Sequence, residues 1–178
     1  MRRRQVLLSA CALLSMPAFG SAAAPAHIEE NLPQARLAGK GTYTWFGLAI
    51  YEAELWVGDK GYRADLPFVL DLRYARKLDG VKIAEASAEQ MEKIGAGTAA
   101  QRARWLANMK TIFPDVKEGT RISGVFVPGG GARFYLDGKA LASVPDPAFA
   151  RAFFGIWLDP ATSARALRAA LLNDAGAR

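Results

Sequence analysis

Cysteine and histidine are almost absent from this chain of 178 residues, which contains one of each, Cys11 and His27. Cys11 lies in a segment that we expect to be removed, so no thiolate remains for a disulfide, a metal site or a nucleophile. His27 is expected in a mobile N-terminal arm. These absences exclude zinc sites, haem ligation by His or Cys, Cys/His catalysis and the Ser/His/Asp triad, and no metal or cofactor is expected.

The chain also lacks a strong excess of charge of one sign. Its formal net charge is +6, but Arg2, Arg3 and Arg4 belong to the segment that we expect to be removed. The remaining chain has 20 basic side chains (23 less these three) against 17 acidic ones. That balance gives no support for a polyanionic partner, and no nucleic acid binding is expected.

The N-terminus has the organisation of a secretory signal peptide. Three arginines precede an apolar run over 6–14 and a small-residue stretch, which predicts a signal peptide over 1–23 with cleavage near Ala23. A lipoprotein site at Cys11 is the weaker alternative, because too few apolar residues precede it, and Arg3-Arg4 leaves twin-arginine export open. A bacterial periplasm is the expected location.

Long hydrophobic runs are missing as well. A spanning helix needs about 20 apolar residues, so no stable membrane insertion is expected. The hydrophobic fraction of 51% is nevertheless enough for one sizeable core. We therefore predict a single domain over 24–178.

The stretch 45–57 is the predicted central strand. Its apolar residues are interrupted only by alternating glutamates, which favours an extended segment with two different faces. One face carries Tyr51 between Ala49 and Ala53, so the ring has small neighbours and its hydroxyl needs a partner or a cavity. The alternative is ordinary packing under a helix.

The periodicity of the rest of the chain changes from strand to helix and back. Strands are predicted over 35–44, 67–75, 120–127, 133–136 and 139–144, and helices over 79–94, 99–113, 146–159 and 163–172. Strands on both sides of a helical middle indicate an α+β domain, an antiparallel sheet with helices gathered on one face.

Five local sequences stand out within about 37–172. They are Gly39-Lys40-Gly41, the strand from Ile50-Tyr51 to Leu55-Trp56, Phe68 to Leu72, Val81-Lys82-Ile83, and Phe154 to Pro160. Together with the order of the predicted elements, they resemble the chalcone isomerase-like family, in particular its bacterial exported branch. The resemblance implies an open-faced antiparallel sheet with helices packed on one face and an apolar ligand cleft.

The same resemblance argues against the reaction of the plant enzymes, which close a flavanone ring with the help of an arginine, a threonine, a tyrosine and a lysine. The arginine position carries Tyr43, the threonine falls on Tyr51, and the tyrosine falls on Asp79. Only the lysine is kept, as Lys82. If the alignment slips by a residue or two, Lys40 or Arg36 could stand in for the arginine. A shared fold without shared chemistry is the simplest interpretation.

Three functional hypotheses follow. The first is a non-catalytic exported protein that binds an apolar or amphipathic small molecule or lipid, such as a fatty acid, through Tyr43, Tyr51, Asp79 and Lys82. The second is an isomerase or intramolecular lyase for a phenolic or enone compound, with Lys82 as its catalytic residue. The third is an envelope interaction protein with a filled cleft. Asp71 paired with Glu52 or Glu54 as a glycosidase site is a weaker idea, because nothing in their strands brings them together.

Overall fold

The computed structural model describes residues 23–173, and most of the predicted signal peptide, 1–22, lies outside them. Six strands follow one another in a single antiparallel sheet in the order β1-β2-β3-β4-β5-β6. Their bounds are β1 Arg36–Trp45, β2 Leu48–Val57, β3 Phe68–Tyr74, β4 Arg121–Val127, β5 Gly131–Leu136 and β6 Lys139–Val144. The α+β class and the open antiparallel sheet are therefore confirmed.

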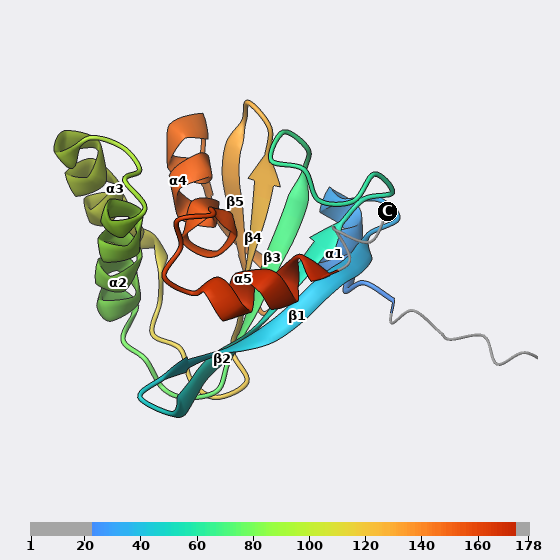
Figure 1. Cartoon of the computed structure of the whole chain (residues 1–178), viewed down its shortest axis with the longest axis horizontal. Coiled ribbons are helices and arrows are strands. Elements are labelled where there is room, and N and C mark those ends of the chain that lie inside the picture. Colours follow the sequence, from blue (N-terminus) through green and yellow to red (C-terminus); the bar gives the residue numbers. More distant parts are fainter. Residues whose placement is uncertain (1–22, 174–178) are drawn as a thin grey trace, which may run out of the picture.

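Among residues 23–173, four helices gather on one side of the sheet, and a fifth lies apart from them (Figure 1). The four are α2 Gly80–Lys93, α3 Ala99–Ile112, α4 Pro147–Leu158 and α5 Arg165–Leu171, and α1 is Ala26–Asn31. Ile28 and Leu32 of this N-terminal segment pack on Trp56, Val69 and Val125, which face away from the main core. The predicted packing of helices on one face is confirmed for α2 to α5, and α1 adds a short helix on the other face (Figure 1).

Local sequence explains where the longer helices begin. The side chain of Asp79 accepts hydrogen bonds from the backbone N–H groups of residues 81 and 82, and Asp146 caps α4 in the same way. Thr98 and Gln101 form a reciprocal capping box at α3. Among residues 23–173, none of the helices combines the length and apolar character needed to cross a bilayer.

Helix α5 lies directly on β1 because β1 carries glycines. A Cβ atom on Gly39 would lie 2.2 Å from the carbonyl oxygen of Ala170, so any other residue would push α5 away. A register shift between Leu37 and Gly39 lies at the same place in β1. The glycines also allow the close approach of the helix.

The predicted strand over 45–57 is in fact the second half of a hairpin. Trp45 ends β1, and β2 begins at Leu48 after a turn at Phe46 and Gly47. The predicted division of β2 into two faces is correct. Ala53, Leu55 and Val57 belong to the main core, whereas Trp56 packs under α1.

Candidate functional site

A cavity of about 400 Å³ lies between the sheet and the helices. Its floor comes from the central strands, with Ile50, Tyr51, Leu72, Tyr74 and Ile122. Its walls come from α2 and α4, with Ile83, Ala86, Ser87, Phe153, Ile156 and Trp157. Pockets of ~300–1,000 Å³ with apolar walls and a few polar groups are typical of small-molecule sites.

Three tyrosines meet on the cavity floor. Tyr51 on β2 stacks on Tyr43 of β1 with ring centroids 5.2 Å apart, and Tyr74 on β3 meets it edge-on at 5.9 Å. The pairing of the strands causes this, because Tyr51 is directly opposite Tyr43 on one side and Tyr74 on the other. Tyr43 and Tyr51 were predicted to bind a ligand, and Tyr74 was not among the predicted ligand-binding residues.

The hydroxyl of Tyr51 accepts a hydrogen bond from the indole N–H of Trp157 on α4, at 2.9 Å. Burial raises the pKa of Tyr51 and of Tyr74 far above the ordinary value, so both phenols keep their protons. In the described part of the chain, the Tyr51 proton has no acceptor of its own. The site therefore offers hydrogen-bond donors, suited to a carboxyl or carbonyl oxygen, rather than a phenolate base.

Lysines lie at the edge of the cavity rather than inside it. Lys82 lines it from the first turn of α2, but its side chain is 77% exposed and its Nζ is 4.0 Å from Glu85 Oε2. Lys93 lines it from the end of α2 and pairs with Glu89 at 2.7 Å. Each can therefore turn toward a ligand at low energetic cost, because exposed ion pairs are weak.

Of the residues predicted to bind a ligand, Tyr43, Tyr51 and Lys82 line the cavity and Asp79 does not. The Asp79 carboxylate instead accepts the N–H groups of Val81 and Lys82 at the start of α2. Arg36 and Lys40, considered as substitutes for an arginine, are also absent from the lining. Trp157 was not predicted to belong to the site, because sequence spacing does not reveal its contact with Tyr51 across 106 positions.

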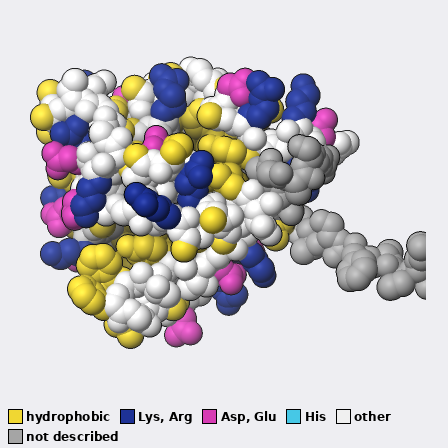
Figure 2. Space-filling view, in the orientation of Figure 1, with side chains coloured by type: hydrophobic (Ala, Val, Ile, Leu, Met, Phe, Trp, Pro, Cys, Tyr) yellow, Lys and Arg dark blue, Asp and Glu magenta, His cyan; other side chains and the backbone are white. Residues whose placement is uncertain are grey.

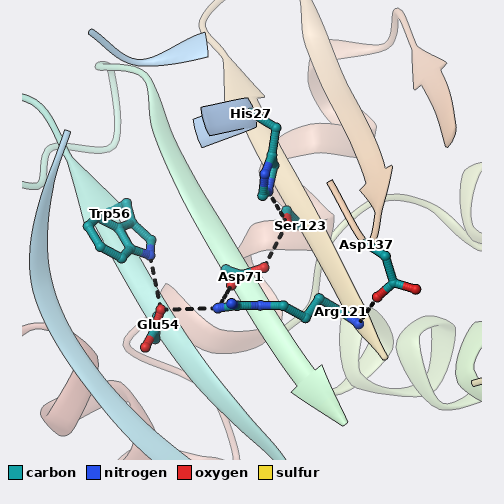
Figure 3. A network of polar contacts seen from close by, with 7 residues as sticks. All are labelled: His27, Glu54, Trp56, Asp71, Arg121, Ser123 and Asp137. Carbon is teal, nitrogen blue, oxygen red and sulfur yellow. Dashed lines mark hydrogen bonds and ion pairs between the residues drawn. The ribbon is translucent and has the colours of Figure 1, made fainter. Parts of the chain in front are cut away.

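A second polar cluster lies on the opposite face of the sheet, beneath α1 (Figure 3). Ser123 on β4 donates its hydroxyl to Asp71 Oδ1 at 2.6 Å and lies 2.8 Å from His27 Nε2. Since the hydroxyl has one proton, His27 is the donor in the second bond. The placement of His27 in a mobile arm is therefore wrong, because it lies in α1 and is only 9% exposed.

Arg121 completes this cluster. Its guanidinium pairs with Asp71 and lies 3.5 Å from Glu54, which also accepts the Trp56 indole N–H. The two carboxylates face each other across β2 and β3, contrary to the expectation that nothing brings them together. Both carboxylates contact the Arg121 guanidinium instead of facing each other across a substrate-sized gap. This arrangement does not suit glycosidase chemistry.

The cluster also differs from a catalytic Ser/His/Asp triad. A triad places histidine between the other two groups, whereas here Ser123 is in the middle, and Ser123 is fully buried. No substrate could reach that hydroxyl. Across the described residues, His, Cys, Asp and Glu side chains nowhere gather in threes as a metal site would require.

The chain is an α+β domain in which an open antiparallel sheet and its helices enclose an apolar cavity. The cavity is large enough for a small molecule. Residues 20–173 match the chalcone isomerase-like family, and the chain belongs to it. It is 27% identical over 136 residues to an uncharacterised protein of Haemophilus influenzae. The aligned segment covers 76% of this chain and 66% of that protein. The chain thus spans slightly less than two thirds of the length of this relative.

The fold is also similar to a solved structure. A fatty-acid binding protein of Arabidopsis thaliana superimposes with a TM-score of 0.62 over 80% of this chain and 89% of that one. The sequence identity is 16%, so this likeness concerns the fold.

Proposed function

We propose that this protein is an exported, periplasmic member of the chalcone isomerase-like family that binds one apolar or amphipathic small molecule, such as a fatty acid, without catalysing a reaction. The observation that carries the proposal is the cavity of about 400 Å³ with apolar walls and the protonated Tyr51 hydroxyl on its floor. A ligand with a long apolar part and one oxygen-bearing group fits this distribution. The fatty-acid binding protein with the same fold supports this choice.

The chemistry of the site favours binding over catalysis. Ring closure in the enzymes of this family uses four residues, of which this chain matches one, Lys82. That lysine is largely exposed, and the buried tyrosines beside the cavity have raised pKa values. The arrangement therefore supplies neutral donors and an apolar wall, which hold a ligand but do not activate one.

Closing the cavity tests the proposal directly. Ala86→Trp places an indole at the cavity wall on α2, and we expect it to weaken binding of a fluorescent fatty acid at least about tenfold. Ala107→Trp is the matched control, because Ala107 is exposed on α3 and does not line the cavity. Equal affinity in both variants, or no ligand in native mass spectrometry of the wild type, would contradict a binding function.

The polar contact is tested by Tyr51→Phe, which removes the donor and leaves the Trp157 N–H without its acceptor. We expect several-fold weaker fatty-acid binding and a loss of about 1 kcal/mol in the free energy of unfolding. The same preparations should be assayed for ring closure of a chalcone. Turnover by the wild type that disappears in Lys82→Ala would favour the isomerase alternative instead.

A further inference from the structure

The tip of the β1–β2 hairpin exposes three large apolar side chains. Trp45 is 56% exposed, Phe46 88% and Leu48 52%, and the Trp45 and Phe46 rings are in edge contact with centroids 4.9 Å apart. In the space-filling view hydrophobic side chains gather at the end of the molecule where Figure 1 places this hairpin (Figure 2). Burial in the core therefore does not explain these residues.

The backbone of the turn makes Phe46 more unusual still. Phe46 has φ 47° and Gly47 has φ 76°, the left-handed conformations of a two-residue hairpin turn. Asn or Asp followed by Gly is the usual choice there, because a bulky residue at positive φ is strained. The β5–β6 hairpin of this protein follows the rule with Asp137 at φ 47° and Gly138 at φ 80°. A phenylalanine at the first position thus favours neither folding nor solubility, which points to a function.

The tip is continuous with the mouth of the cavity. Trp45 lines the cavity together with Leu78 and Lys82, so one indole belongs to both the exposed tip and the apolar interior. Val81, 43% exposed, is the neighbour of Lys82 on the first turn of α2. An apolar molecule that leaves the cavity past Trp45 would reach the tip.

Positive charge borders the tip. Arg76 holds the hairpin by donating its Nε–H to the carbonyl of Ala49 at 2.8 Å, and exposed Lys77 follows it. The connection from β3 to α2 then carries one acid, Asp79, whose carboxylate is engaged by backbone N–H groups. With Lys82 this segment has three cations and one anion, which complements a negatively charged surface.

The size and composition of the tip favour a lipid bilayer over a protein partner. Three partly exposed side chains offer on the order of 400 Å², about half of the ~800 Å² per partner that a stable protein interface buries. Trp and Phe beside Lys and Arg are the side chains that favour the membrane–water boundary. A narrow protruding tip can insert between headgroups without any spanning segment.

We infer that the β1–β2 hairpin tip is a docking element for an anionic lipid bilayer and holds the cavity mouth against the membrane surface. Phe46 and Leu48 enter the headgroup region, and Arg76, Lys77 and Lys82 face the lipid phosphates. Docking itself is independent of the ligand. Exchange of acyl-chain ligands between bilayer and cavity is its consequence, and that part rests on the proposed function.

Vesicle flotation with the chain 24–178 tests the inference. We expect the wild type to float with vesicles of phosphatidylcholine and phosphatidylglycerol, less with phosphatidylcholine alone, and less at high salt. Phe46→Asn should weaken vesicle binding about tenfold or more, because it removes the most exposed apolar side chain. The fold should be preserved or stabilised, since asparagine suits the positive φ.

The matched control is Ala107→Trp, because it adds an exposed indole on α3, away from the tip. It should not change vesicle binding. Absence of flotation by the wild type, or equal flotation by Phe46→Asn, would overturn the inference. So would a concentration-dependent dimer in sedimentation that Phe46→Asn abolishes, because the tip would then bind a second copy.

Failure of this inference is distinguishable from failure of the proposed function. Phe46→Asn should keep its affinity for a fluorescent fatty acid in solution without vesicles, whereas Ala86→Trp should lose that affinity and still float with anionic vesicles. If Phe46→Asn loses both properties while remaining folded, the tip is part of the cavity and the docking role is wrong.

Discussion

The two faces of the sheet make different kinds of interaction, although the same strands supply both faces. On β3, Phe68, Leu70, Leu72 and Tyr74 turn toward α2–α5, whereas Val69 and Asp71 turn toward α1. The first face packs aromatic rings and leaves a cavity. The second holds a short N-terminal helix by apolar packing and by a hydrogen bond to Ser123, next to paired charges within the sheet. A void beside apolar side chains costs packing contacts only, whereas a void within a buried polar cluster would also leave hydrogen-bonding groups without partners. The cavity therefore belongs to the face where a void is least costly.

The largest effect is expected from the apolar face. Phe153 contacts the rings of Phe113, Phe149, Phe154 and Trp157 and also lines the cavity. Phe153→Ala should lower the free energy of unfolding by about 3–5 kcal/mol in urea denaturation, because it removes these contacts and enlarges the void. Phe46→Ala is the control, as Phe46 is 88% exposed and should change stability by less than about 1 kcal/mol. Similar losses in both variants would show that packing around the cavity is not what holds this face.

The next effect concerns the paired charges on the α1 face. Asp71 is 1% exposed, and Asp71→Leu should lower the free energy of unfolding by about 2–4 kcal/mol, because Arg121 and Ser123 lose their common partner. The double variant Asp71→Leu, Arg121→Met should recover much of that loss, since it removes the guanidinium that Asp71→Leu leaves without its buried partner, while Glu54 keeps its hydrogen bond from Trp56.

The control for this pair lies on the surface. Asp65→Asn breaks the exposed Arg63–Asp65 pair and should cost less than about 1 kcal/mol. If the double variant is no more stable than Asp71→Leu alone, the ionic interaction is not the source of the loss, and the comparison between the two faces fails.

The smallest effect is a pH dependence of the α1 face. Burial lowers the pKa of His27, opposed in part by the charge of Asp71, while Arg121 lowers it further and Glu30 raises it. The unfolded chain therefore binds the proton more readily than the folded one. Stability is complete above the ordinary histidine pKa of 6.5 and falls as the pH drops through that value toward the lower folded-state pKa.

Thermal unfolding at pH 7.5 and pH 5.5 measures this contribution, both values being chosen around the histidine pKa of about 6.5. His27→Gln can keep a hydrogen bond to Ser123 without titrating, so it should lose less stability on acidification than the wild type. Amide exchange should place the wild-type loss in α1 rather than in α4. An identical pH response in the two proteins would mean that His27 does not couple α1 to the proton.

Much of the fold could be predicted because its signals are local. Alternation identified the strands, and the caps Asp79 and Asp146 marked where α2 and α4 begin. The hairpin turn at Phe46-Gly47 was missed because its first residue contradicts the usual turn chemistry, which is also why it suggests a function. His27 was misplaced because its partner Ser123 lies 96 positions away and no local pattern links them.

The candidate site divides in the same way. The sequence by itself determined the strand periodicity, the side of β2 on which Tyr51 lies and, through its resemblance to a family, the kind of fold. Only the tertiary structure decided that Tyr51 meets Trp157, that Asp79 lies outside the cavity, and that α2 and α4 leave space above the sheet. The physical reason is the distance along the sequence between the residues that determine each feature. Backbone periodicity and capping depend on neighbours within a few residues, whereas a cavity depends on how far large side chains hold separate elements apart.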